Sequence, residues 1–196
     1  MPVWAMTGKL RSGKTLMAVA RIKEYLDQGR KVATNLDLNL EHLIPIHSKK
    51  TICYRLPDHP NVESLNSVGL GYDSDEIKGD RYNGLMVIDE CASIFNTRSY
   101  NAPDRAALID WFIHVGKRRW DVIFIIQHIN AMDKQFREMF CEHIVYCNRF
   151  DRLQIPVLSL MSKLAFGEPV TLPKVTRGLV MYGSGMTATK VETWYC

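Results

Sequence analysis

Residues 8–15 read Gly8-Lys9-Leu10-Arg11-Ser12-Gly13-Lys14-Thr15 and match the phosphate-binding loop pattern GxxxxGK(S/T) at every fixed position. An apolar stretch, Val3–Met6, precedes this loop, and a helical pattern follows it, with one predicted apolar face made of Leu16, Val19, Ile22 and Leu26. This context predicts that all eight loop residues bind the phosphates of ATP through their backbone N–H groups. Lys14 would add a positive charge beside the β- and γ-phosphates, and the Thr15 hydroxyl is a predicted ligand of Mg²⁺.

A second pattern is an apolar run that ends in two acids, Leu85-Met86-Val87-Ile88-Asp89-Glu90. A continuous apolar run is typical of a central strand that is covered on both faces. Asp89 fits a Walker B aspartate that holds Mg²⁺, and Glu90 is the predicted general base that activates water. Two acids also commonly cap a strand with no further role, but the upstream phosphate loop favours the Walker B interpretation.

A third polar residue, Gln127, follows the apolar run Val122–Ile126. At the carboxyl end of a parallel strand it would face the ligand crevice and contact the γ-phosphate or the attacking water. It is equally well explained as a plain strand-end amide. A glutamate after the Walker B strand is typical of P-loop proteins with an additional strand, so we expect Val122–Ile126 to lie between Val3–Met6 and Leu85–Ile88.

Composition and length set the class of protein. The chain has 196 residues, of which 46% are hydrophobic and 23% charged, and its net charge of +4 is too small to argue for nucleic acid binding by itself. Its five cysteines form no CxxC pair, and no apolar run approaches the ~20 residues of a membrane helix. These features predict a cytoplasmic, globular domain.

The predicted fold is α/β, a P-loop NTPase of the RecA-like, additional-strand type with a mostly parallel central sheet and helices on both faces. We expect one domain over residues 1–196, with a nucleotide-binding core at 1–150 and a C-terminal extension at 151–196. Residues 57–83 are predicted to be a long loop with one helical turn near Val62–Val68. The apolar segment Pro156–Phe166 is either a buried helix or a docking surface.

Several further residue types were weighed for a role. The arginines that could complete a neighbouring subunit's site are Arg98, Arg105, Arg118 and Arg119, although Lys117-Arg118-Arg119 is better explained as a solvated helix end. Cys141 and Cys147 are predicted to pack in the core. The histidines show no spacing typical of metal ligands.

Beyond the loop, the chain resembles the gene I proteins of filamentous phages, which are virion assembly and export ATPases of the zonula occludens toxin (Zot) family. The resemblance covers almost the whole chain, and it is carried by the blocks Gly8–Thr15, Ala33–Leu38, Leu85–Glu90, Phe95–Ser99, Ile109–Phe112, Glu142–Cys147, Leu172–Lys174 and Val191–Trp194.

The resemblance implies a domain on the cytoplasmic face of the host inner membrane, attached to a transmembrane segment that would follow Cys196. It also implies a homo-oligomer, with a ring expected, that acts on phage coat protein and the phage single-stranded DNA complex. Other phage export proteins in the inner and outer membranes are implied partners. The family pattern has an arginine where this chain has Gly116, which leaves Arg98, our first choice, or Arg118 as the residue donated to a neighbour's site.

Three alternatives were considered. A DNA-translocating or packaging ATPase would share this core but needs a basic, aromatic loop, for which Arg149-Phe150-Asp151-Arg152 is the only hint. A non-catalytic, toxin-like interaction module would not require Glu90 beside Asp89. A nucleotide kinase would require an arginine-rich lid, and residues 57–83 contain only Arg81.

Overall fold

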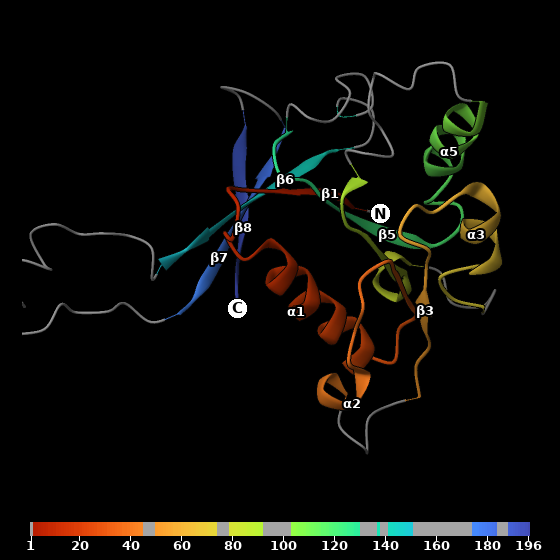
Figure 1. Ribbon diagram of the computed structural model, residues 1–196, viewed down its shortest axis with the longest axis horizontal. Coiled ribbons are helices and arrows are strands. Elements are labelled where there is room, and N and C mark those ends of the chain that lie inside the picture. Colours follow the sequence, from red (N-terminus) through yellow and green to blue (C-terminus); the bar gives the residue numbers. More distant parts are fainter. Residues whose placement is uncertain are drawn as a thin grey trace, which may run out of the picture.

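The computed structural model describes residues 2–44, 50–73, 79–91, 103–129, 137, 141–150, 174–183 and 188–196, and for 103–105 it describes the backbone only. These residues build an eight-stranded sheet with the strand order β3-β2-β4-β5-β1-β6-β7-β8 (Figure 1). The parallel strands are β1 (Val3–Thr7), β2 (Val32–Thr34), β3 (Cys53–Arg55), β4 (Gly84–Ile88), β5 (Trp120–Ile125) and β6 (His143–Arg149). The antiparallel strands β7 (Thr176–Tyr182) and β8 (Thr189–Tyr195) extend the sheet beyond β6.

The order of the central strands is the one predicted from the acids after β4. Strand β5 pairs with β4 on one side, where Met86 lies opposite Val122, and with β1 on the other, where Val3 lies opposite Val122. β5 therefore separates the P-loop strand from the Walker B strand, which confirms the additional-strand arrangement. Because the strands are parallel, the loops that follow β1, β4, β5 and β6 meet at one edge of the sheet.

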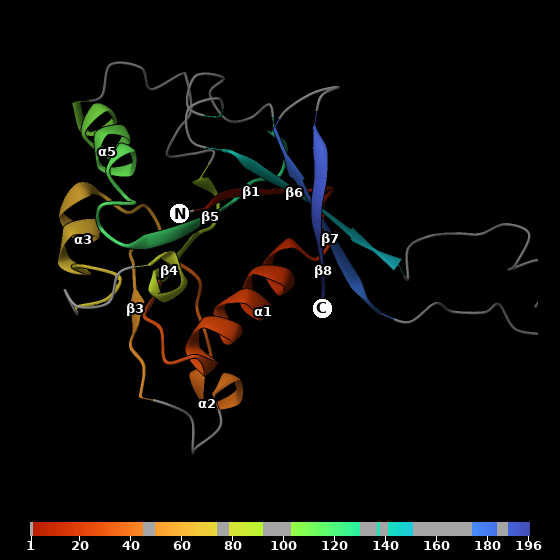
Figure 2. The same ribbon diagram turned by 180° about the vertical axis from the view of Figure 1, so that it is seen from behind.

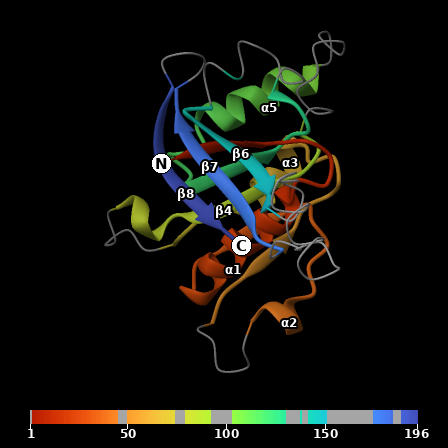
Figure 3. The same cartoon turned by 90° about the vertical axis from the view of Figure 1, so that its left-hand side faces the viewer.

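Helices cover both faces of the sheet, as predicted. On one face α1 (Lys14–Asp27) buries an apolar cluster with β1, β4, β5 and β6. On the other face α3 (Val62–Ser67) and α5 (Pro103–Ile113) close a second cluster, which includes Trp111 and Phe124. Figures 2 and 3 show α1 and α5 on opposite sides of the strands. Two short elements, α2 (Leu40–Leu43) and the 3-10 helix η1 (Asp80–Tyr82), complete the description.

The apolar face predicted for the first helix is wrong at its first position. Leu16 is 52% exposed, and the residues of α1 that are buried are Met17, Ala18, Ile22, Tyr25 and Leu26. The physical reason is that the face of α1 that packs on the sheet is turned toward Met17 and Ala18, so Leu16 lies outside that face and lines the pocket described below. Helix α2 and strand β8 are not predicted from the sequence, and in β8 the alternation of polar and apolar residues is weak. Cys141 and Cys147 are buried, as predicted.

Two predicted features lie outside the described residues, and these are Arg98 and the apolar segment Pro156–Phe166.

At the opposite, amino edge of the sheet, the buried carboxylate of Asp121 in β5 joins three other side chains. Asp121 accepts hydrogen bonds from the Tyr25 hydroxyl at 2.8 Å, from Arg30 Nη2 at 3.0 Å and from Asn83 Nδ2 at 3.0 Å. Arg30 also donates through Nε to the Asn83 carbonyl at 2.6 Å and lies 3.7 Å from the centre of the Tyr25 ring. Burial raises the pKa of the Asp121 carboxyl, and the three donors oppose that shift. The network ties the end of α1 to β4 and β5.

Removal of this carboxylate should destabilise the fold strongly. We expect Asp121→Ala to lower the free energy of unfolding by about 3–5 kcal/mol, because Arg30 and Asn83 would keep buried donors without their acceptor. Asp27→Ala is the matched control, since it breaks only the exposed Lys23–Asp27 pair on α1 and should cost about 0.3–0.5 kcal/mol. Urea denaturation of both variants measures the difference. Equal effects would contradict a structural role for the Asp121 network.

Candidate nucleotide-binding site

The phosphate loop curls between the end of β1 and the start of α1. Arg11 and Gly13 have positive φ angles of 59° and 88°, and Ser12 N donates to the Lys9 carbonyl at 3.1 Å. Gly13 caps α1 without a side-chain hydrogen bond to the helix, so the loop and the first turn of α1 keep backbone N–H groups available for an anion.

Close packing explains both glycines of the loop. A Cβ atom on Gly8 would lie 2.6 Å from the Cys147 carbonyl oxygen of β6. A Cβ atom on Gly13 would lie 2.6 Å from Oγ1 of Thr176, the first residue of β7. A side chain at either position would therefore push the loop off the sheet.

Two polar groups of the loop are placed for a phosphate. Lys14 Nζ donates to the carbonyls of Gly8 at 2.9 Å and Lys9 at 3.2 Å, which folds the ammonium group back over the loop. The Ser12 hydroxyl is buried and makes no hydrogen bond within the described residues. A buried hydroxyl inside a ring of N–H groups is well suited to an anionic oxygen.

These residues line a cavity of about 620 Å³ at the carboxyl edge of the sheet. The loop and α1 contribute residues 10–16, and the ends of three strands contribute the other lining residues, which are Asp89, Glu90, Ile125, Ile126, Gln127 and Arg149. The cavity thus brings together loop residues and strand-end residues from distant parts of the sequence. Of the predicted loop residues, Gly8 and Lys9 do not line it and instead support Lys14 through their carbonyls.

Asp89 is half-buried beside the loop. Burial raises the pKa of its carboxyl and the Glu90 charge adds to the rise, whereas the Glu90 N–H, which donates to Asp89 Oδ1 at 2.8 Å, and the nearby Lys14 lower it. A partly desolvated carboxylate that lines the same cavity as Thr15 offers, with the Thr15 hydroxyl, the hard oxygen donors that Mg²⁺ prefers. The donor set therefore fits a magnesium ion held by one carboxylate, one hydroxyl and phosphate oxygens.

Glu90 and Gln127 border the same cavity. Glu90 is exposed and has a positive φ of 54°, an uncommon conformation for a residue with a side chain. Gln127 follows β5, and its carbonyl accepts a hydrogen bond from the Thr7 hydroxyl at the end of β1, at 3.4 Å. The strand order predicted for β5 thus brings Gln127 to the cavity, while its role stays a prediction.

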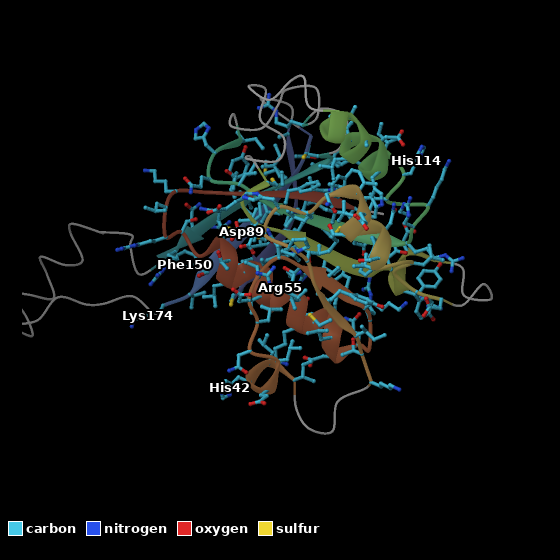
Figure 4. All side chains as sticks on the ribbon, turned by 45° about the vertical axis from the view of Figure 1, so that its right-hand side comes forward. His42, Arg55, Asp89, His114, Phe150 and Lys174 are labelled. Carbon is cyan, nitrogen blue, oxygen red and sulfur yellow. The ribbon has the colours of Figure 1, made fainter. Side chains whose placement is uncertain are left out.

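The sequence analysis missed one charged residue of the cavity, Arg149. It ends β6 on the same face as Val145 and Cys147, two residues beyond Cys147, and therefore points to the α1 side of the sheet. The rule used for Gln127, a polar residue directly after an apolar run, points here to Asn148, whereas the alternation of β6, with Val145, Cys147 and Arg149 on one face, is the signal that would find Arg149. In Figure 4, Phe150, the next residue, lies near Asp89, whereas His42 and His114 lie far from both.

Two of the other arginines considered for a site, Arg118 and Arg119, do not line this cavity. Arg118 and Arg119 precede β5, at the amino edge of the sheet, where Arg118 lies over the Trp111 ring and Arg119 donates to the Tyr72 carbonyl at 3.0 Å. The side chain of Arg105 is outside the described part of the structure, as is Arg98.

No helix within the described ranges is long and apolar enough to cross a bilayer.

Comparison with known proteins identifies relatives over almost the whole chain. The profile of the zonular occludens toxin (Zot) family matches residues 3–164. The Gene 1 protein of Enterobacteria phage fd is 44% identical over 99% of this chain and 56% of its own length. The Gene 1 protein of Enterobacteria phage I2-2 is 45% identical over 99% of this chain and 53% of its own length. The chain therefore spans about half the length of these curated relatives.

Solved structures show the same fold at low sequence identity. The N-terminal domain of zonular occludens toxin from Neisseria meningitidis aligns over 98% of this chain and 93% of its own, with a TM-score of 0.52 and 14% identity. The DNA-packaging ATPase of Sulfolobus turreted icosahedral virus aligns over 97% of each chain, with a TM-score of 0.53 and 14% identity. Both likenesses support the P-loop NTPase fold. The family profile covers most of this chain, and the relatives named above are more than 40% identical to it over 99% of its length. The chain therefore belongs to the zonular occludens toxin (Zot) family.

Proposed function

We propose that residues 1–196 form one Mg²⁺-dependent ATPase domain that drives the assembly and export of a filamentous phage. The observation that carries this proposal is the cavity in which Lys14, Thr15, Asp89 and Glu90 meet. It combines a phosphate-binding loop, oxygen ligands for a metal and a carboxylate suited to activating water. A non-catalytic interaction module would need the first of these at most.

Each residue of the cavity has a chemical task in this proposal. Thr15 and Asp89 hold Mg²⁺, which when bound neutralises charge on the β- and γ-phosphate oxygens. Lys14 leaves its loop carbonyls and pairs with the phosphates. Glu90 accepts a proton from the attacking water, and Gln127 orients that water or the γ-phosphate. Arg149, at the end of β6, adds positive charge from the same chain.

The cellular setting is proposed from the relatives named Gene 1 protein. The domain would work at the cytoplasmic face of the host inner membrane, held there by a membrane segment of the longer protein. Its partners would be other copies of itself, phage coat protein, the phage single-stranded DNA complex and other phage export proteins of the two membranes.

Two substitutions separate binding from hydrolysis. Lys14→Ala should weaken ATP binding, measured by calorimetry, because the loop loses its mobile cation. Glu90→Gln should retain ATP binding and lose ~10²–10⁴-fold in turnover, the usual effect of removing a general base. The unfolding transition of both variants should match that of the unmodified chain, since neither side chain is in the core. Unchanged ATP affinity in Lys14→Ala would exclude the loop as the nucleotide site, and near-normal turnover in Glu90→Gln would exclude Glu90 as the base.

A second candidate function is DNA translocation or packaging. It is favoured by the fold shared with a viral DNA-packaging ATPase and by Arg149, which lines the cavity and is followed by the aromatic residue Phe150.

We expect coat protein, rather than single-stranded DNA, to stimulate ATP hydrolysis by the full-length protein. Steady-state ATPase assays with each component alone measure this. Stimulation by naked single-stranded DNA alone would favour translocation instead. Absence of ATP hydrolysis both with coat protein and with single-stranded DNA would favour the interaction module.

The active form is proposed to be a ring in which Arg98 completes the site of a neighbouring subunit. An arginine donated in trans stabilises the charge that develops on the γ-phosphate. The sequence supports Arg98 because it follows Glu90 by eight residues and belongs to the family block Phe95–Ser99. The competing interpretation is an ion pair of Arg98 within its own chain.

Mixed oligomers test this proposal. Full-length subunits with Arg98→Ala and subunits with Lys14→Ala should each be inactive alone. A mixture should recover part of the ATPase activity, because some interfaces then combine an intact loop with an intact arginine. If mixtures that are shown to co-assemble recover no ATPase activity, Arg98 does not complete a neighbouring site and its role is structural.

A further inference from the structure

Asn35 forms an unusual contact with the Walker B segment. It follows β2, which pairs in parallel with β4 as far as Thr34 and Val87. Its side-chain oxygen accepts a hydrogen bond from the Asp89 N–H at 2.8 Å, and its side-chain Nδ2 donates to the Asp89 carbonyl at 3.1 Å. The amide side chain of Asn35 therefore hydrogen-bonds both the backbone N–H and the backbone carbonyl of Asp89.

The local backbone explains why this position needs an asparagine. The Leu36 N–H donates to the Thr34 hydroxyl at 3.1 Å, a local turn that leads the chain away from β4. The backbone ladder thus ends at Thr34, and the Asn35 amide supplies the next donor and acceptor in its place. Aspartate has no donor for the Asp89 carbonyl, and an apolar residue of the same size has neither group.

This contact fixes the peptide bond that leads into Glu90. The carbonyl of that peptide is held by Asn35, and its N–H is held by the Asp89 carboxylate at 2.8 Å. Glu90 itself has a φ of 54°, a left-handed conformation that is unfavourable for a residue with a Cβ atom. Such a conformation persists only where surrounding contacts enforce it.

A third hydrogen bond fixes the Asn35 amide itself. Nδ2 also donates to the Asp58 carbonyl at 3.2 Å, in the loop after β3. That loop is held in turn by Arg55, which bonds the Asp58 and Asp37 carboxylates at 2.8 Å each. The Asn35 amide is thereby anchored between two loops of the carboxyl edge.

We propose that Asn35 is a positioning residue for Glu90, which sets the direction in which that carboxylate enters the nucleotide cavity. The inference rests on the proposed role of Glu90 as general base. Asn35 does not line the cavity, so it would act on turnover through the Asp89–Glu90 peptide and leave nucleotide binding to the phosphate loop.

The test is a mutant cycle in the full-length protein, with Asn35→Ala, Glu90→Gln and the double variant. Asn35→Ala should lower kcat by about 10- to 100-fold, the usual effect of a misplaced catalytic group, and leave KM for ATP close to that of the unmodified protein. In the Glu90→Gln background the same substitution should cause little further loss, because the group that Asn35 positions is already disabled. Asn66→Ala is the matched control, since Asn66 accepts a hydrogen bond from Trp111 Nε1 at 2.9 Å away from the site and should leave kcat unchanged.

Two results would overturn the proposal. One is an unchanged kcat in Asn35→Ala, and the other is an equal loss with and without Glu90. A normal turnover in Glu90→Gln would instead contradict the proposed function, so the two failures are distinguishable. If Asn35→Ala does not fold, Asn35→Asp keeps the acceptor for Asp89 N–H, removes both donors, and is read in the same cycle with the same expectation.

Discussion

The contact of the phosphate loop with strands β6 and β7 is the constraint on which the site depends. Gly8 approaches the Cys147 carbonyl and Gly13 approaches Thr176 so closely that neither position has room for a Cβ atom. This packing holds the loop against the carboxyl edge of the sheet. Lys14 and Thr15 then start α1 at the point where Asp89, Gln127 and Arg149 leave their strands. A loop with the right sequence on a different sheet edge would not meet these groups.

Strand order is the second constraint, and it follows from the same topology. Placing β5 between β1 and β4 moves Asp89 and Glu90 one strand away from the loop and leaves the end of β5 between them. In the proposed function, the attacking water and the γ-phosphate would lie between Glu90 and Lys14.

Much of this could be predicted from the sequence because the signals are local. The motif from Gly8 to Thr15 fixes four of its eight positions, and Leu85–Ile88 and Val122–Ile126 are continuous apolar runs that are buried in the structure. The order of the strands could be predicted because Glu90 directly follows Asp89, a pairing typical of one topological class. Arg149 was missed because another polar residue, Asn148, stands between it and the apolar run Ile144–Cys147.

Other features depend on tertiary contacts that no local pattern encodes. Leu16 fits an apolar period of α1, but the face that packs on the sheet is the one with Met17 and Ala18, so Leu16 lines the cavity instead. Asn35 reads as a turn residue, and its role emerges only when β2 and β4 are neighbours in the sheet. The same holds for Asp121, whose partners Tyr25, Arg30 and Asn83 come from distant parts of the chain.

The central claim is that one cavity at this edge binds and hydrolyses Mg-ATP. A crystal structure with Mg²⁺ and a non-hydrolysable ATP analogue tests it most directly. The account predicts that Lys14 leaves the Gly8 and Lys9 carbonyls to contact the γ-phosphate, that Thr15 and Asp89 share the metal ion, and that Glu90 faces the γ-phosphate through a water molecule. An analogue bound away from residues 8–15, or a metal ion held without Asp89, would contradict it.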